Sequence, residues 1–133
     1  MRSFTVKIGV TAQNLKTMAQ NVANLVNQER AQYGLQPLIY DTVLASAATT
    51  RANEITEKFS HTRPNESSFT TVSPRARGEN IAAGQATPAS VMESWMKSQG
   101  HRENILRTTY SSIGVGVVLK GGRYYWTQLF GLQ

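Results

Sequence analysis

Apolar side chains recur at helical spacing in three segments of the chain. In the first segment, which Gly34 ends as a natural stop, they are Leu15, Met18, Val22, Leu25, Val26 and Tyr33. The second segment follows Asp41, a suitable N-cap, and its apolar face consists of Leu44, Ala47, Ala48, the stem of Arg51, Ile55 and Phe59. The third begins at Thr87-Pro88, stops near Gly100, and buries Val91, Met92, Trp95 and Met96. A further short helical turn is predicted over residues 102–106.

The C-terminal part changes to the two-residue period of strands. Apolar residues alternate from Ile113 to Leu119, Gly121-Gly122 turns the chain, and residues 124–130 run back, which predicts a hairpin. This turn pairs Leu119 with Tyr124, Val117 with Trp126, and Ile113 with Phe130. Gly114 and Gly116 lie on the opposite face of the hairpin, where they leave room for a helix to pack closely.

Residues 60–90 contain three prolines and many small polar residues, so we expect mostly loop, with a short ordered piece around Gly78 to Ala82. The order is helix, helix, loop, helix, strand, strand. It predicts an α+β fold in which helices cover a small antiparallel sheet. We find no internal repeat and no second-domain boundary in the sequence.

The length of 133 residues suits one domain with its own core, and 40% hydrophobic with 17% charged residues is typical of a folded protein. No apolar run approaches the roughly 20 residues that span a bilayer. At the N-terminus Phe4, Val6, Ile8 and Val10 alternate, which indicates a short strand or a linker rather than a signal-peptide core. The chain is therefore consistent with a mature or trimmed form of a secreted protein.

The chain has no cysteine, which excludes disulfides and any zinc site with sulfur ligands. Its net charge of +6 favours polyanions as partners, although general solubility explains such a charge equally well. No run of basic residues or interleaved aromatic stripe is present, so nucleic acid is not an expected partner.

The two histidines lie in dense polar segments: Phe59-Ser60-His61-Thr62-Arg63-Pro64 and Gly100-His101-Arg102-Glu103-Asn104-Ile105-Leu106. A third polar segment between them is Gly78-Glu79-Asn80-Ile81. Histidine is the side chain best suited to bind metals and transfer protons near neutral pH. We therefore expect His61 and His101 to meet in one site.

Together with the segment Val91 to Leu106, these motifs closely resemble those of bacterial members of the CAP superfamily, which contains cysteine-rich secretory proteins, antigen 5 and pathogenesis-related proteins. Gly34-Leu35-Gln36-Pro37-Leu38 and Tyr124 to Gly131 match further parts of the bacterial SCP-like pattern. The resemblance implies a three-layer α-β-α sandwich with a central cleft and an extracellular location. It covers residues 17–133, and residues 1–16 are then an N-terminal extension or linker.

The resemblance also implies which residues form the cleft, which in the family holds two histidines and two glutamates. His61, His101 and Glu79 match the histidines and the first glutamate. Ser98 stands at the usual place of the second glutamate. Glu93, a substitute candidate, points about 140° away from that place on a helix of 3.6 residues per turn. Glu103 and Asn104 are candidates for the cleft rim. The structural alternative for Glu103 is an acidic residue that favours the first turn of a helix, and the alternative for Asn104 is a residue that anchors a loop.

Two imidazoles and one carboxylate form a ligand set for a divalent metal, with zinc favoured by ligand type and one position left open for water. The alternative is a hydrogen-bonded pair that braces loop to helix. No organic cofactor is expected. A serine nucleophile at Ser60 or Ser98 is disfavoured because no nucleophile elbow is present.

The sequence thus favours a secreted binding module for a protein, a lipid or an anionic envelope polymer. The alternative is a metal-dependent, protease-like hydrolase that uses the same three candidate catalytic residues: His61, Glu79 and His101.

Overall fold

A computed structural model describes residues 10–132 of the chain. Its helices are α2 (Ala12–Gln32), α3 (Thr42–Ile55), α4 (Pro88–Met96) and α5 (Gln99–Leu106), with a 3-10 helix η1 (Phe69–Val72). Its strands are β1 (Ile39–Tyr40), β2 (Gly78–Ala83), β3 (Ser112–Lys120) and β4 (Arg123–Gly131). The alternation seen at residues 4–8 lies outside the described residues, so the short strand proposed there stays a prediction. Helix α2 already begins at Ala12, so residues 12–16 continue into the first helix of the domain.

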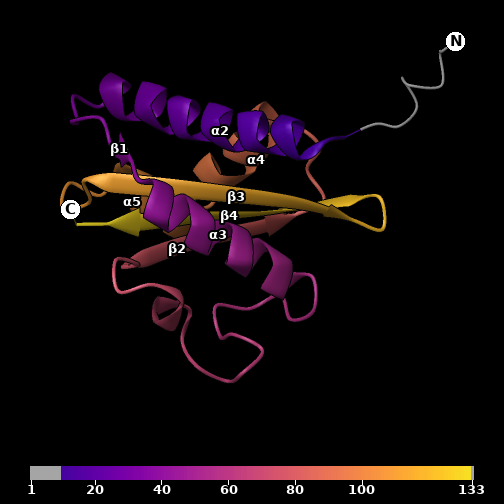
Figure 1. Ribbon diagram of the computed structural model, residues 1–133. Helices are drawn as coiled ribbons and strands as arrows, with labels where there is room; N and C mark the ends of the chain where they lie inside the picture. The colour runs from indigo at the N-terminus through magenta and orange to yellow at the C-terminus, as the bar shows by residue number, and fades with distance from the viewer. Residues whose placement is uncertain (1–9, 133) are drawn as a thin grey trace, which may run out of the picture.

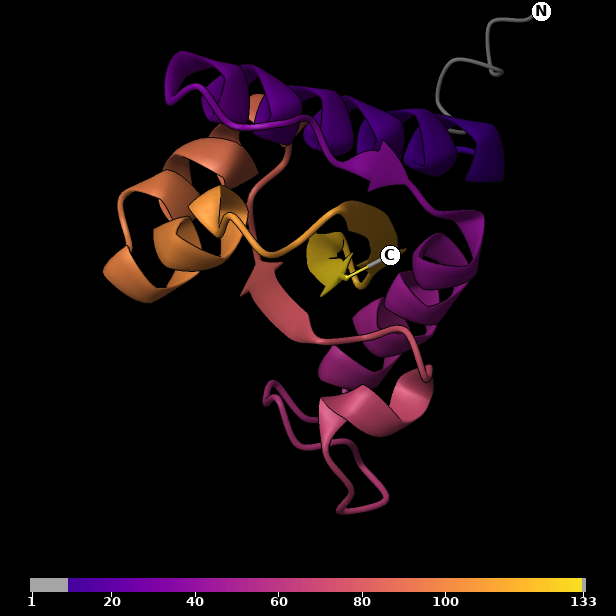
Figure 2. The ribbon, with the colours of Figure 1, turned by 90° about the vertical axis from the view of Figure 1, so that its left-hand side faces the viewer.

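The four strands form one sheet in the order β1-β3-β4-β2, between two layers of helices (Figures 1 and 2). Helices α2, α4 and α5 cover one face, where the larger core contains Val22, Val26, Trp95, Trp126 and Phe130. Helix α3 covers the other face over a smaller core that includes Leu44, Ala48 and Leu129. The predicted α+β sandwich of three layers is confirmed.

The hairpin of β3 and β4 has the predicted register, with Leu119 opposite Tyr124, Val117 opposite Trp126, and Ile113 opposite Phe130. The sheet is mixed rather than purely antiparallel, because β1 pairs with β3 in parallel. Strand β1 has only two residues, which are too few to show an alternating pattern, so the sequence analysis did not predict this strand.

The helix caps predicted from sequence are present. The Asp41 side chain accepts hydrogen bonds from the backbone N–H groups of Val43 and Leu44, and Thr87 caps α4 together with Ser90. Gly34 follows α2 with a φ of +71°, a conformation that glycine adopts readily. Gly100 is not a stop, since it lies in the first turn of α5.

Two aromatic residues assigned to buried helix faces are instead exposed. Tyr33 lies just beyond α2, and Phe59 follows the end of α3 with 56% of its surface exposed. Arg30 is buried, and its guanidinium donates to the carbonyl oxygens of Gln36, Ile105 and Arg107 at 2.8–2.9 Å. It therefore ties the end of α2 to the end of α5, where helix carbonyls lack partners.

Candidate functional site

The two histidines line one cleft of about 510 Å³. His61 comes from the loop after α3, and His101 comes from the first turns of α5. The other lining residues are Phe59, Ser60, Ile81, Ala82, Ala83, Gln85, Ser94, Trp95 and Ser98. The lining contains two imidazoles and several neutral polar groups but no acidic side chain. The cleft is therefore suited to hydrogen-bonding or anionic groups of a ligand.

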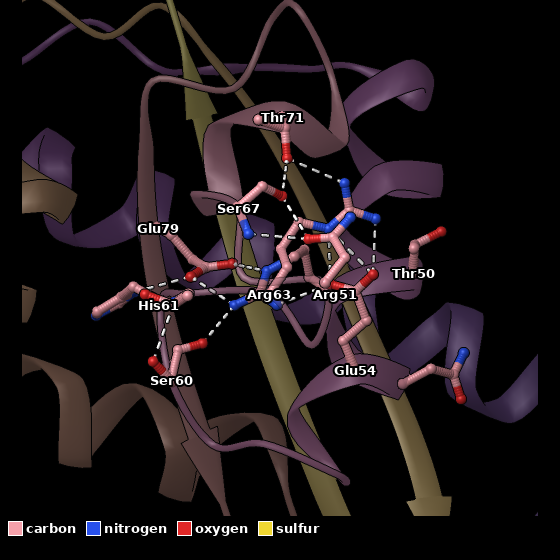
Figure 3. Close-up of polar contacts among 12 residues, drawn as sticks. Thr50, Arg51, Glu54, Ser60, His61, Arg63, Ser67, Thr71 and Glu79 are labelled. Carbon is pink, nitrogen blue, oxygen red and sulfur yellow. Dashed lines mark hydrogen bonds and ion pairs between the residues drawn. The ribbon is translucent and has the colours of Figure 1, made fainter.

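Behind His61 lies a buried ion pair (Figure 3). Glu79 on β2 accepts from Arg51 Nε at 2.7 Å through Oε2 and from the Arg51 guanidinium at 3.1 Å through Oε1. Both side chains are fully buried. Glu79 Oε1 also lies 2.8 Å from His61 Nδ1, while 55% of the His61 side chain is exposed.

This arrangement fixes the hydrogen of the His61 ring. A carboxylate paired with a guanidinium is ionised and only accepts hydrogen bonds, so His61 Nδ1 must donate. In a neutral ring the lone pair is then on Nε2, the other ring nitrogen. Glu79 is thus placed as an orienting group behind the imidazole, an arrangement common for histidines that bind metals.

Arg51 extends the network into the loop that carries His61. Its guanidinium also donates to Glu54 at 2.8 Å and to the Ser60 carbonyl at 2.6 Å. Arg63 binds the same Glu54 carboxylate at 2.7 Å and also donates to Thr71 (Figure 3). The loop is therefore attached to α3 on both sides of His61, through the Ser60 carbonyl and through the Arg63 side chain.

A second network holds α5 against β2. Asn80 Nδ2 donates to the His101 carbonyl at 3.1 Å and to Gln128 Oε1 at 2.9 Å. Asn104 Nδ2 donates to Asn80 Oδ1 at 2.9 Å. Asn104 therefore lies behind the cleft, where it anchors α5 to β2.

One ring nitrogen of His101, Nδ1, is buried without a hydrogen-bond partner in the described residues. Burial, and then the charge of nearby His61, lower the pKa of His101 below its ordinary value of 6.5. The neutral imidazole, which is the form that binds metals or accepts a proton, is favoured in the folded protein.

The remaining candidates lie in different places. Ser98 lines the cleft at the N-cap of α5. Glu93 forms an exposed ion pair with Lys97 at 3.2 Å and does not line the cleft. Glu103 accepts from Gln99 at 3.1 Å on the exposed side of α5, also outside the cleft lining. Neither glutamate therefore supplies the missing second carboxylate.

The sequence suggests Glu79 as a metal ligand. In the structure, however, Arg51 already binds both oxygens of the Glu79 carboxylate. In the described part of the chain, no three histidine, aspartate or glutamate side chains form a group that could hold a metal ion. Of the three expected ligands, the two imidazoles are the ones that line the cleft.

Arg51 is a site residue that the sequence pattern does not reveal. The pattern places its stem on the apolar face of the helix and predicts no partner for its charged end. A guanidinium on a face made of alanine and leucine is costly unless a buried acid pairs with it, and this was the available signal.

The lowered pKa of His101 predicts a dependence of stability on pH. The unfolded chain binds a proton at His101 more readily than the folded protein does. The contribution of neutral His101 to the free energy of unfolding is therefore complete above about pH 6.5. It decreases as the pH falls towards the lower pKa of His101 in the folded state. Chemical unfolding with a chelator present should show a steeper loss between about pH 7 and pH 5 for the unchanged protein than for His101→Gln. Parallel curves for the two proteins would contradict the prediction.

Comparison with known proteins identifies the class to which this fold and cleft belong. The profile of the Cysteine-rich secretory protein family, called CAP, matches residues 23–130. The chain therefore belongs to the CAP family. In the described residues, no helix has the length and apolar character needed to cross a membrane.

Two bacterial proteins are similar over most of the chain. The uncharacterized protein YkwD of Bacillus subtilis (strain 168) is 40% identical in an alignment of 119 residues, and the match covers 84% of this chain and 46% of YkwD. The crystal structure of an extracellular protein with an SCP domain from Bacillus anthracis str. Ames matches with a TM-score of 0.83 and 26% identity. That match covers 94% of this chain and 45% of the other. The chain thus spans less than half the length of these two relatives.

More distant structures share the fold alone. One is NaASP2, solved with Zn²⁺, with a TM-score of 0.68 at 15% identity over 92% of this chain and 84% of the other.

Proposed function

We propose that this CAP domain is an extracellular binding module whose cleft receives an anionic ligand on the His61 and His101 imidazoles. The observation that carries the proposal is the cleft lining, which has two imidazoles and no acidic side chain. The net charge of +6 also favours an anionic ligand. Among the expected partners, an anionic envelope polymer suits this chemistry better than a neutral lipid. The extracellular location is supported by the relative from Bacillus anthracis.

The proposal includes a divalent cation held between the two imidazoles, with zinc favoured by nitrogen ligands. His61 would use Nε2, because Nδ1 bonds to Glu79. The buried Nδ1 of His101 has no other partner in the described residues, which supports a ring available as a ligand. Zinc in the structure of NaASP2 is consistent with this choice of metal. A cation bound this way would leave coordination positions open for an anionic group of the ligand.

Calorimetric titration tests the cleft with two probes, Zn²⁺ alone and poly(glycerol phosphate) with and without Zn²⁺. His61→Ala and His101→Ala should each weaken binding by at least about tenfold, since each removes one of two anchoring groups. Glu93→Ala is the matched control, because Glu93 does not line the cleft, and it should bind as the unchanged protein does. If the two histidine variants bind both probes normally and differ only in stability, the imidazoles serve as a structural brace.

A metal-dependent hydrolase remains the second candidate, favoured by the neutral state of His101. Against it stands Glu79, whose charge is already neutralised by Arg51, so the carboxylate is poorly placed as a free general base. A screen of peptide and ester substrates with added zinc separates the two functions. Hydrolysis that His101→Ala abolishes, without loss of the fold, would replace the binding proposal with the enzymatic one.

A further inference from the structure

The histidine cleft leads past Phe59 into a second hollow, which has a volume of about 360 Å³. Phe59 and Ala83 line both spaces, so the second hollow begins where the cleft ends. Thr56, Arg123 and Tyr125 are among its other lining residues. At the boundary, 56% of the surface of Phe59 is exposed. The aromatic ring is therefore available to a molecule that extends from the cleft into the second hollow.

The second hollow lies beyond the end of α3, on the sheet face that this helix covers. Leu129 belongs to the core under α3, and Tyr125 lies four residues before it on β4, so both side chains point to this face. Ala83 on β2 is directly opposite Tyr125. The turn between β3 and β4 lies at the same end of the molecule as the end of α3 (Figure 1), and there Lys120 Nζ donates to Thr56 Oγ1 at 3.5 Å. The second hollow is therefore bounded by the hairpin and by the loop that follows α3.

Two cationic side chains lie next to each other at the second hollow. Lys120 and Arg123 are opposite each other in the ladder of β3 and β4, and like charges in that position repel. Within residues 10–132 neither of them forms an ion pair. The Arg123 guanidinium lies 5.9 Å from the centre of the Tyr125 ring. Glu57, the acidic residue of the lining, is exposed and pairs with neither cation. An anionic group bound in the second hollow would relieve the repulsion.

The order of these features along the surface selects the chemistry of a ligand. The imidazoles of the cleft attract one anionic group, Lys120 and Arg123 attract another, and the exposed ring of Phe59 lies between them. An acidic sugar meets both requirements, because its carboxylate is attached to a ring whose C–H face packs against an aromatic side chain. A chain of acidic sugars repeats the charge and the apolar face from one unit to the next. A polymer without rings, such as poly(glycerol phosphate), has the charges but no flat face for Phe59.

We propose that the second hollow is a subsite for an anionic polysaccharide. One sugar places its carboxylate in the histidine cleft, a ring of the chain packs on Phe59, and a second carboxylate binds Arg123 and Lys120. This inference rests on the proposed function, since the first carboxylate occupies the histidine cleft. It adds that the ligand is a chain of acidic sugars and that the affinity depends on the length of the chain.

Calorimetric titration of the full chain with galacturonic acid and with its linear tetramer tests the subsite, with Zn²⁺ present in every titration. The tetramer should bind at least about tenfold more tightly than the monomer, because its second contact is intramolecular. This gain exceeds the roughly fourfold advantage that four equivalent units give by number alone. The fully methyl-esterified tetramer keeps the sugar rings but carries no charge, and it should show no binding.

Arg123→Gln should weaken binding of the tetramer at least about fivefold, because it removes a charge-assisted contact, and should leave binding of the monomer unchanged. Arg107→Gln is the matched control. Arg107 is also exposed, its guanidinium lies 5.4 Å from the centre of the Tyr110 ring, and it lines neither space. The control loses the same charge and should bind the tetramer normally. Phe59→Leu keeps an apolar side chain without the ring, and it should weaken binding of the tetramer about threefold or more.

The monomer separates this inference from the proposed function. If the monomer does not bind, or binds His101→Ala as well as the unchanged protein, the histidine cleft is not the anion site, and the proposed function fails together with the subsite. If the monomer binds at the cleft but the tetramer gains no affinity, only the subsite is overturned. Equal binding of the tetramer by Arg123→Gln and by the unchanged protein would overturn the subsite as well.

Discussion

Replacement of Arg51 by methionine should lower the free energy of unfolding by about 3–5 kcal/mol, because it leaves the Glu79 carboxylate buried with a single partner. Neither side chain of the Arg51–Glu79 pair reaches solvent, so water cannot take the place of the guanidinium. The substitution also removes the donors to Glu54 and to the Ser60 carbonyl. Chemical unfolding at pH 7, followed by circular dichroism, measures the loss.

The double variant Arg51→Met/Glu79→Met distinguishes a buried unpaired charge from loss of packing. It should recover a substantial part of the stability, because two apolar side chains need no charged partner. Lys97→Met is a control that breaks the exposed Glu93–Lys97 pair, and it should cost less than about 0.5 kcal/mol. If Arg51→Met costs no more than Lys97→Met, the pair does not support the site as we describe it.

The Arg51–Glu79 pair should affect ligand binding as well as stability, because Glu79 also contacts the ring of His61. In the double variant the ring of His61 loses the carboxylate that holds its Nδ1 hydrogen. The fold is then largely restored while the imidazole is no longer oriented. We therefore expect the double variant to bind zinc more weakly than the unchanged protein even though its fold is largely retained. The reason is that residues hydrogen-bonded to a metal-binding histidine affect the affinity for the metal.

The parts of the fold that local chemistry specifies could be predicted from the sequence. Asp41 and Thr87 cap helices through bonds to residues two or three positions away. Gly121 and Gly122, both with positive φ, form a two-residue turn and thereby set the whole register of β3 and β4. Each of these signals acts within a few residues, which is the range that a pattern in sequence describes.

Features that depend on distant partners were not predictable in the same way. Strand β1 exists only because Ser112 and Ile113 are there to pair with it. Phe59 continues the apolar spacing of α3, but the helix ends at Ile55 and the ring is exposed. Arg30 binds carbonyl groups at the end of α5, a contact across 75 residues to Ile105.

In the candidate site, too, some features could be predicted from the sequence and others depend on distant partners. That His61 and His101 share a cleft followed from the polar motifs and the resemblance to CAP proteins. The role of Glu79 did not, because it depends on Arg51, a residue 28 positions away on α3. Sequence motifs indicated which side chains meet, whereas the charge partner decides whether a carboxylate is free to bind a metal.

Replacement of Gly116 by alanine should destabilise the protein by about 1–3 kcal/mol or more, because the layers of the sandwich are in direct contact there. A methyl group at Gly116 would overlap backbone atoms of Ala48 and Thr49 in α3, and one at Gly114 would overlap Leu44 and Ala45. Backbone atoms of a helix cannot move aside as a flexible side chain can. The helix would have to lift from β3 as a unit, and it would loosen the contacts of Leu44 and Ala48.

Gly100→Ala is the matched control for this prediction. Gly100 lies in α5, and no atom outside its own helix turn stands within 4 Å of the position of an added methyl group. Alanine there should stabilise the protein by roughly 0.5–1 kcal/mol, since it reduces the freedom of the unfolded chain. Unfolding curves of the two variants should therefore shift in opposite directions. If Gly116→Ala also stabilises the protein, then α3 is not held against the sheet at this point.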